Sequence, residues 1–295
     1  DSKMSALTIF HTGSVIVDEA LLYRRPSDHP LAWTHLLRDE SRLVEVPVSC
    51  YLLEGPHGRL LIDTGWHPDN RTKLGQIANL RQQYLAKRAV LPQGQAIDEQ
   101  LAKMGISPKD LDLVMLSHLH CDHADGLRLV KDAPGIMVSK AEWCAAKRDH
   151  LRYLPHQWKH VAINTYPWNT KIGPWDAGFD VYGDGSVVTV ALPGHSYGLT
   201  ATIIRSSNIS SSDPARWVPN ASGNSVHDGR EFVLLTSDAG YGRPSLEEDL
   251  RPGVVIKAGW ARRSLDWIRQ VSKDPRCLRV IASHDPEIIP GTIQL

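Results

Sequence analysis

The chain has 295 residues, 42% of them hydrophobic and 22% charged, which is enough apolar side chain for a sizeable core. Lysine plus arginine equals aspartate plus glutamate at 33 each, so the charge gives no reason to expect nucleic acid or an anionic membrane as a partner. No apolar run approaches the roughly 20 residues of a membrane-spanning helix. The N-terminus lacks a signal-peptide core and the four cysteines form no CxxC pair, which predicts reduced thiols and a cytoplasmic protein.

The first part of the chain is rich in β-forming segments. Residues 7–10 and 14–17 flank a His-Thr-Gly turn and are expected to pair as a hairpin. Residues 46–54 and 59–63 flank a Gly-Pro-His-Gly turn and are expected to form two further strands. The second of these ends at Asp63, which either caps the strand or is a carboxylate that holds a ligand histidine.

Helical segments alternate with these strands. Residues 71–90 are helix-prone, with apolar side chains at irregular helical spacing. A second helix, 97–104, is expected to place Met104 in the core and to end before a glycine. Ser139 and Glu142 have the spacing of a capping box, which predicts the start of a third helix. Further strands are expected at 136–138, 186–192, 200–205, 231–237 and 278–282, and a further helix at 259–272.

Residues 118–123 read His-Leu-His-Cys-Asp-His and follow an apolar strand expected at 111–116. Three imidazoles and a carboxylate at this density are typical of metal ligands. They suit Zn²⁺, and also Mn²⁺, Fe²⁺ or Co²⁺, better than Ca²⁺ or Mg²⁺. The alternative, a polar histidine-rich turn, requires this pattern to have arisen by chance.

Five expected strands end in a polar residue that can bind a metal or support a ligand. These residues are Asp63, His118, His195, Asp238 and His284. Because strand ends at one edge of a sheet converge in space, we expect these side chains to meet. The seven candidate metal ligands are His118, His120, Asp122, His123, His195, Asp238 and His284. They are enough for two metal ions that share one carboxylate, a centre that lowers the pKa of its water and stabilises an oxyanion.

Two long segments are expected to be irregular. Residues 150–180 contain His150, His156 and His160, which lack metal-ligand spacing and are expected at the surface or in hydrogen bonds of the core. Residues 206–230 are dense in serine, asparagine, proline and glycine, which predicts an inserted loop that is functional or mobile in its middle, or that rests on a second subunit.

The motifs together resemble those of the metallo-β-lactamase superfamily, in order and in spacing. They are Asp63-Thr64-Gly65, the 118–123 motif, Pro193-Gly194-His195, Asp238 and Ser283-His284-Asp285. The resemblance implies a single domain over residues 1–295, with the α/β fold of a four-layer αβ/βα sandwich: two mixed β-sheets flanked by helices. It also implies that His118, His120 and His195 bind one metal. By the same resemblance Asp122, His123 and His284 bind a second metal, Asp238 bridges both, and Asp63 supports the loop of the site.

Within the superfamily, the chain is most similar to the N-acyl homoserine lactonases. The similarity lies in residues 46–54, in residues 61–65, in the Ser-His-Leu-His-x-Asp-His-Ala-x-Gly pattern, and in Tyr241 three positions after Asp238. The common zinc β-lactamases have cysteine in place of Asp238, and the flavin-linked di-iron members have glutamate in place of His120. Thioesterases of the glyoxalase II type add a C-terminal helical region for which little chain remains.

This resemblance implies a metal-dependent hydrolase that opens the ring of N-acyl homoserine lactones by attack of a hydroxide bridging two divalent ions, Zn²⁺ first. Asp122, Asp238 and Tyr241 are then the catalytic residues, and Tyr241 donates a hydrogen bond to the lactone carbonyl. The alternative for Tyr241 is a packing role in a turn. The implied partner is a small lactone or ester, with no nucleic acid and no membrane, and a homodimer is left open.

The chain departs from these lactonases at Cys121, where phenylalanine is common, at Leu199, where histidine is common, and in the long 206–230 segment. These departures leave open another hydrolase of the same fold, acting on a different lactone, a thioester or a phosphoester. A mononuclear iron persulfide dioxygenase shares the HxHxDH motif but uses fewer ligands. A metal-binding protein without catalysis is the third alternative.

Overall fold

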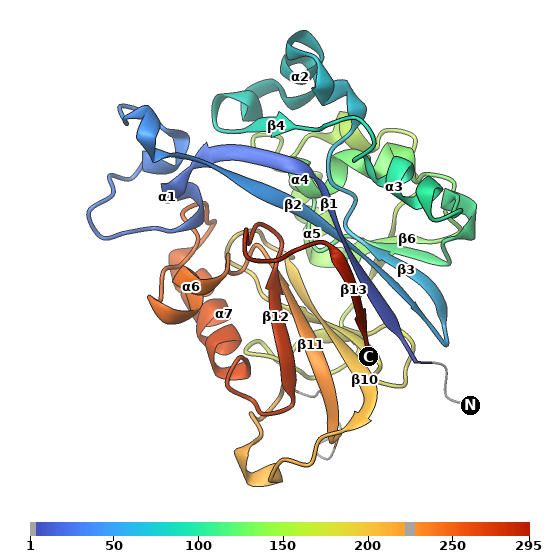
Figure 1. Ribbon diagram of the computed structural model, residues 1–295. Helices are drawn as coiled ribbons and strands as arrows, with labels where there is room; N and C mark the ends of the chain where they lie inside the picture. Colours follow the sequence, from blue (N-terminus) through green and yellow to red (C-terminus); the bar gives the residue numbers. More distant parts are fainter. Residues whose placement is uncertain (1–3, 222–227) are drawn as a thin grey trace.

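The computed structural model describes residues 4–221 and 228–295, and two β-sheets pack face to face with helices on both outer sides (Figure 1). Each sheet is mixed, because it contains parallel and antiparallel neighbours. The predicted α/β sandwich of two mixed sheets flanked by helices is therefore confirmed. In the described part of the chain, no helix has the length and apolarity needed to cross a membrane.

The first sheet contains β1 (Ala6–Asp18), β2 (Leu43–Gly55), β3 (Gly58–Ile62), β4 (Arg88–Val90), β5 (Leu113–Met115), β6 (Ile136–Ser139), β7 (Asn164–Tyr166) and β13 (Gly291–Gln294). The second contains β8 (Gly178–Asp180), β9 (Val187–Ala191), β10 (Thr200–Ile209), β11 (Arg230–Ser237) and β12 (Cys277–Ala282). The α-helices are α1 (Glu19–Leu22), α2 (Lys73–Leu80), α3 (Ile97–Lys103), α4 (Cys121–Ala124), α5 (Lys140–Ala146), α6 (Arg243–Glu247) and α7 (Ala258–Val271). Short 3₁₀ helices are η1 (Ala32–Thr34), η2 (Glu40–Arg42), η3 (Pro68–Arg71), η4 (Arg81–Leu85), η5 (Pro108–Asp110), η6 (Asp125–Leu129), η7 (Pro155–Trp158) and η8 (Pro214–Arg216).

Both sheets contain neighbouring strands that run parallel. The first sheet runs β13-β1-β2-β3-β5-β6-β7, with β4 on β1, and its strands β3, β5, β6 and β7 are parallel. The second sheet runs β12-β11-β10-β9-β8, and β11 and β12 are parallel. Because parallel strands share a direction, the carboxyl ends of neighbouring strands meet at the same edge of each sheet.

The apolar strands are buried on both faces, as their near-continuous hydrophobic runs indicate. In β11, Val233 and Leu235 pack between the two sheets, whereas Phe232 and Leu234 pack under α7. In β3, Leu61 instead belongs to the cluster formed with α3 on the outer side of the first sheet. The alternation follows from the two-residue period of a strand. Packing on both faces holds the strands in place, and with them the residues that directly follow the strand ends.

The hairpin predicted for residues 7–10 and 14–17 is wrong, because both runs belong to the single strand β1. β1 pairs with β2 along its whole length, and the register shifts between His11 and Ser14. Gly13 has a φ of 71° at this shift. A β-bulge with a glycine in the left-handed region resembles a turn in sequence but keeps the strand continuous.

Two helical predictions also differ from the structure. The helix expected at 71–90 is divided into α2, η4 and β4, and Arg81 has a φ of 49° where α2 ends. α3 forms as predicted, but Met104 is its C-cap and is 43% exposed, so its predicted core position is wrong. The helical period persists to Met104, but the helix ends one residue earlier and turns that side chain outward.

The predicted loop at 206–230 is shorter than expected and partly packed. β10 continues to Ile209, which pairs with Arg230 of β11. The backbone N–H of Val218 donates to Asp274, and Ala221 is fully buried in the cluster under α7. The prediction that the middle of the segment stays out of the core is therefore wrong for Val218 and Ala221, and residues 222–227 lie outside the described residues.

Candidate metal centre

The candidate ligands follow the ends of strands from both sheets. His118 lies three residues after β5, His195 four residues after β9, and Asp238 directly after β11. Asp63 directly follows β3 and His284 follows β12 by two residues. The sandwich therefore brings side chains from distant parts of the chain to one edge, as the strand-end pattern predicted.

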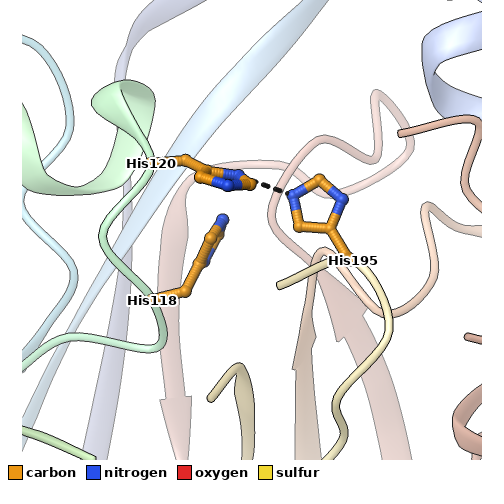
Figure 2. Close-up of side chains that lie close together, drawn as sticks. All are labelled: His118, His120 and His195. Carbon is orange, nitrogen blue, oxygen red and sulfur yellow. Dashed lines mark hydrogen bonds between the residues drawn. The ribbon is translucent and has the colours of Figure 1, made fainter. Parts of the chain in front are cut away.

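The first group consists of His118, His120 and His195, all buried, with one ring nitrogen of each within 4.8 Å of the others (Figure 2). His120 Nδ1 lies 2.9 Å from His195 Nε2. The ring of His118 lies edge-on to both, with ring centres 4.6 Å from His120 and 5.2 Å from His195. Three imidazoles that converge in this way are a typical zinc ligand set.

The second group consists of Asp122, His123, Asp238 and His284, also buried and within 4.8 Å of one another. His284 Nε2 lies 3.0 Å from Asp122 Oδ2 and 3.4 Å from Asp238 Oδ1. His123 Nε2 lies 3.2 Å from the same Asp238 oxygen. Two imidazoles and two carboxylates provide a second set of ligands for a divalent ion.

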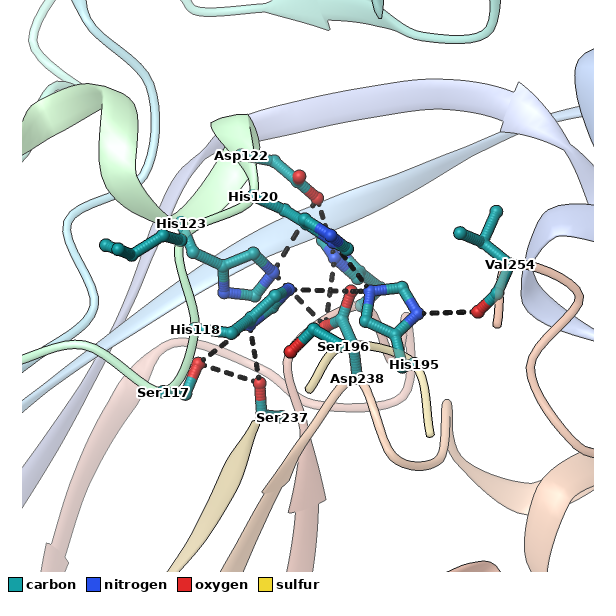
Figure 3. Close-up of polar contacts among 12 residues, drawn as sticks. Ser117, His118, His120, Asp122, His123, His195, Ser196, Ser237, Asp238 and Val254 are labelled. Carbon is teal, nitrogen blue, oxygen red and sulfur yellow. Dashed lines mark hydrogen bonds and ion pairs between the residues drawn. The ribbon is translucent and has the colours of Figure 1, made fainter. Parts of the chain in front are cut away.

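Asp238 lies between the two groups and presents one oxygen to each (Figure 3). Its Oδ1 faces His123 and His284, whereas its Oδ2 lies 3.4 Å from His195 Nε2 and 3.9 Å from His118 Nε2. A carboxylate in this position can ligate two ions at once, which is the role that the family resemblance implied for it.

Hydrogen bonds hold the outer nitrogens of the histidines and leave the inner ones facing the centre. His284 Nδ1 lies 2.7 Å from the carbonyl oxygen of Pro47. Figure 3 shows the corresponding contact of His195, whose Nδ1 lies 2.9 Å from the carbonyl oxygen of Val254. His123 Nδ1 lies 2.9 Å from Asp63 Oδ2. Such outer contacts fix the ring orientation and the tautomer, so that Nε2 keeps a lone pair for a metal.

Asp63 therefore supports the ligand loop and is more than a strand-end cap. In addition to His123, its carboxylate accepts hydrogen bonds from the backbone N–H and the hydroxyl of Ser117, both at 2.7 Å. Asp63 and Ser237 both have positive φ, at 61° and 50°. Strained backbone at the ends of β3 and β11 is typical of a site whose geometry the surrounding fold imposes.

The residues present fit a pair of divalent ions. His118 Nε2, His120 Nε2, His123 Nε2 and Asp238 Oδ1 are buried and form no hydrogen bond. Buried polar atoms without partners are rare in folded proteins and indicate a bound ligand or ion. The unbonded nitrogens of His118 and His123 and the oxygen of Asp238 face the interior of the two groups, where a cation would satisfy them.

The electrostatics differ between the two groups. Burial lowers the pKa of His118 and His120 well below the usual value, and lowers that of His195 to about 4, so the first group is neutral. In the second group burial acts in the same direction, but the Asp238 and Asp122 carboxylates together outweigh it and raise the pKa of His284 to about 9. The second group thus has a negative potential that favours bound cations.

Tyr241 lies over both groups, with its ring centre 5.7 Å from that of His284 and 6.3 Å from that of His195. Its hydroxyl donates to Asp238 Oδ2 at 3.1 Å. Burial and the nearby carboxylates raise the pKa of Tyr241 well above its usual value, so it remains a phenol and a hydrogen-bond donor. Tyr23 donates to the backbone carbonyl of Tyr241 at 2.5 Å and holds the turn in place.

Several other residues discussed in the sequence analysis do not belong to either ligand group. His156 Nε2 contacts the carbonyl oxygen of Asn79, and neither it nor His150 nor His160 belongs to the two ligand groups. Cys121 is buried in an apolar cluster with Tyr241, and its sulfur lies 3.9 Å from Asp122 Oδ1. Among the described residues it is likewise outside both ligand groups. Leu199 is fully buried in the cluster under α7.

Two residues of the site were missed by sequence reasoning. Lys87, just before β4, is buried with its Nζ 2.8 Å from Asp122 Oδ1. Glu142 was assigned to a capping box, but only half of the box forms: Ser139 Oγ accepts from the Glu142 N–H, while the Glu142 carboxylate turns inward. A lysine in a polar segment and a glutamate at a capping position both have ordinary surface roles, so no local signal pointed to the site.

We expect Lys87→Met to lower the unfolding free energy of chelator-treated protein by about 3 kcal/mol, since it breaks the buried ion pair with Asp122 and leaves His284 as the main compensation of that charge. Burial disfavours the charged ammonium, but Asp122 and its neighbours, Asp238 among them, together outweigh burial and raise the pKa of Lys87. The loss should shrink in metal-loaded protein, where a cation compensates Asp122. Urea unfolding with and without metal measures both values. Lys103→Met, at an exposed site, is the control, and an equal loss with and without metal would contradict the expectation.

Comparison with known proteins places these features in a family context. The family model described as the metallo-beta-lactamase superfamily matches residues 43–206. The N-acyl homoserine lactonase AiiB of Agrobacterium fabrum is 40% identical over 268 residues, covering 86% of this chain and 85% of the relative. An N-acyl homoserine lactonase of Bacillus cereus is 30% identical, covering 83% and 84%.

Solved structures share the fold. An N-acyl homoserine lactone hydrolase with N-hexanoyl-L-homoserine bound at its catalytic metal centre superposes with a TM-score of 0.70 at 22% identity, covering 97% of this chain and 94% of that one. AidC, a dizinc quorum-quenching lactonase, superposes with a TM-score of 0.62 at 16% identity, covering 100% and 93%.

Proposed function

The chain belongs to the metallo-β-lactamase superfamily, and from this membership we propose that it is a metal-dependent hydrolase that opens the lactone ring of N-acyl homoserine lactones. The observation that carries the proposal is the position of Asp238 between the two ligand groups, with the Tyr241 hydroxyl on one of its oxygens. The lactonase relatives, which match over more than four fifths of their length, support this choice of substrate.

The proposed ligand roles follow the two groups. His118, His120 and His195 would hold one divalent ion, Asp122, His123 and His284 would hold the other, and Asp238, which lies between the groups, would serve both. Zn²⁺ suits the nitrogen-rich first group best, and Mn²⁺, Fe²⁺ and Co²⁺ also suit the set. When bound, two such ions supply a water of lowered pKa and polarise the ring carbonyl.

The side chains of the chain account for the remaining requirements of ring opening. Hydrolysis adds the oxygen of water to the carbonyl carbon, breaks the ring C–O bond, and moves one proton to the leaving alkoxide. Tyr241 donates a hydrogen bond to the carbonyl oxygen as negative charge develops there. Asp238, which is 2% exposed and lies between the two ligand groups, or a further water relays the proton of the attacking water to the alkoxide. Asp122, held by Lys87, keeps the second group in place.

The proposed setting is a single domain in the cytoplasm. Both sheets contribute to one site, which supports a single domain. Four free cysteines, two of them buried, support a reducing compartment.

A substrate panel on metal-replete protein tests the function. We expect N-hexanoyl homoserine lactone to be opened faster than a thioester, because the relatives of the chain are lactonases, and faster than a phosphodiester, which offers Tyr241 no carbonyl oxygen. Chelation should abolish turnover, and two equivalents of Zn²⁺, Mn²⁺ or Co²⁺ per chain should restore it. Cleavage of the thioester or phosphodiester without lactone opening would overturn the proposal. One iron per chain, with oxygen consumed on a persulfide, would indicate a dioxygenase instead.

A further inference from the structure

Glu142 is a fully buried carboxylate that contacts two of the loops bearing the candidate ligands. Its Oε1 accepts a hydrogen bond from the backbone N–H of Leu119 at 3.0 Å. Its Oε2 accepts from the hydroxyl of Ser196 and from the N–H of Gly198, both at 2.8 Å. These three donors lie 23, 54 and 56 positions from Glu142 along the chain, so only the folded structure brings them together.

The bonded positions are adjacent to every histidine of the first ligand group. Leu119 stands between His118 and His120, and Ser196 directly follows His195. One carboxylate thus fixes the distance between the loop after β5 and the loop after β9. No comparable contact of Glu142 reaches Asp122, His123 or His284 among the hydrogen bonds of the described residues.

The packing around Glu142 supports a rigid connection. Ser139 Oγ donates to the carbonyl oxygen of Gly198 at 2.8 Å, which adds a second contact between the start of α5 and the loop after β9. A Cβ on Gly198 would lie 2.1 Å from the Glu142 nitrogen, so the two backbones approach as closely as only glycine allows. The loop carrying His195 therefore has little freedom to move away from α5.

We infer that Glu142 is the residue that positions the three histidines of the first metal site, by holding their two loops at a fixed separation. A buried carboxylate is costly unless it is fully hydrogen-bonded, and its three donors compensate that cost. If Glu142 only stabilised the fold, loss of its carboxylate would change the metal affinity of both ligand groups alike. The contacts instead predict an effect confined to the first group. The inference concerns metal binding and holds whatever the substrate is.

The experiment measures metal affinity site by site in a double-mutant design. His284→Ala weakens the second group and leaves the first for study, whereas His120→Ala does the reverse. In each background, Glu142 and Glu142→Gln proteins are compared by competition titration of Zn²⁺ against a chromophoric chelator. We expect Glu142→Gln to weaken binding about tenfold in the His284→Ala background, the lower end of the effect of losing a supporting contact. In the His120→Ala background, affinity should stay within twofold.

A second variant keeps the test decisive if Glu142→Gln folds poorly. Ser196→Ala removes one of the three donors and should weaken the first site by a smaller factor in the same direction. Combined with Glu142→Gln, it should add little, because both changes remove the same contact. Glu99→Gln is the matched control, since Glu99 caps α3 and pairs with Arg71. It should lower Tm without changing either affinity. Equal weakening of both sites, or a lowered Tm with both affinities intact, would overturn the inference.

Discussion

Asp238→Asn is expected to reduce turnover of a homoserine lactone by about 10³-fold or more and to lower the metal content below two ions per chain. An amide is a far weaker ligand than a carboxylate, and both ligand groups face this side chain. The contribution of a metal to transition-state charge is several kcal/mol, and about 4 kcal/mol corresponds to 10³-fold in rate. The change is nearly isosteric and retains an oxygen for Tyr241, so it isolates the loss of charge and ligation from packing.

The measurement is kcat together with metal stoichiometry by elemental analysis, after equilibration with excess Zn²⁺ and gel filtration. Asp249→Asn provides a matched control, because Asp249 forms a partly exposed ion pair with Arg262 away from the site. It should change neither value. Two tightly bound ions in Asp238→Asn would show that Asp238 does not bridge them. Unchanged turnover would remove it from the mechanism as well.

Tyr241→Phe is expected to lower kcat roughly 10–100-fold while metal content stays the same. Losing a principal oxyanion donor costs about 10²–10³ in turnover, and the effect is smaller here because a metal shares the task. The hydroxyl remains protonated and donates to Asp238 in this structure, so its proton must turn from Asp238 to the carbonyl oxygen when the lactone binds. Because this bond strengthens in the transition state, kcat should fall more than KM changes.

The control for this variant is Tyr166→Phe, which removes another buried hydroxyl, one that contacts Thr189 in the core between the sheets. It should lower stability slightly and leave kcat unchanged. If Tyr241→Phe retains full kcat on the lactone, Tyr241 is a packing residue in its turn. The preference for a lactone over other substrates would then rest on the relatives alone.

The family and the fold could be predicted because their signals are local. The 118–123 motif is contiguous, and the other ligand types directly follow apolar strands at Asp63, His195, Asp238 and His284. The structure confirms two mixed sheets flanked by helices. It also brings the seven candidate ligands into two groups, although their roles stay predictions until metal is measured.

Local patterns failed where the chain departs from a regular period. The Gly13 bulge resembles a turn, so β1 was divided in two. α2 ends at Arg81, which has a positive φ, although no proline or glycine in the sequence indicates a helix end there. In the 206–230 segment, a polar composition concealed the burial of Ala221 and the strand that runs to Ile209. In each case tertiary packing overrode a weak local preference.

By itself, the sequence determined which residues can bind metal and which strands carry them, because ligand chemistry and hydrophobic periodicity belong to neighbouring residues. Only the tertiary structure decided how those ligands are held. Lys87 reaches Asp122 across 35 positions, and Glu142 reaches Ser196 across 54. A charged side chain in a polar segment is normally solvated. It becomes part of a metal centre only when packing buries it beside the one partner that can compensate its charge.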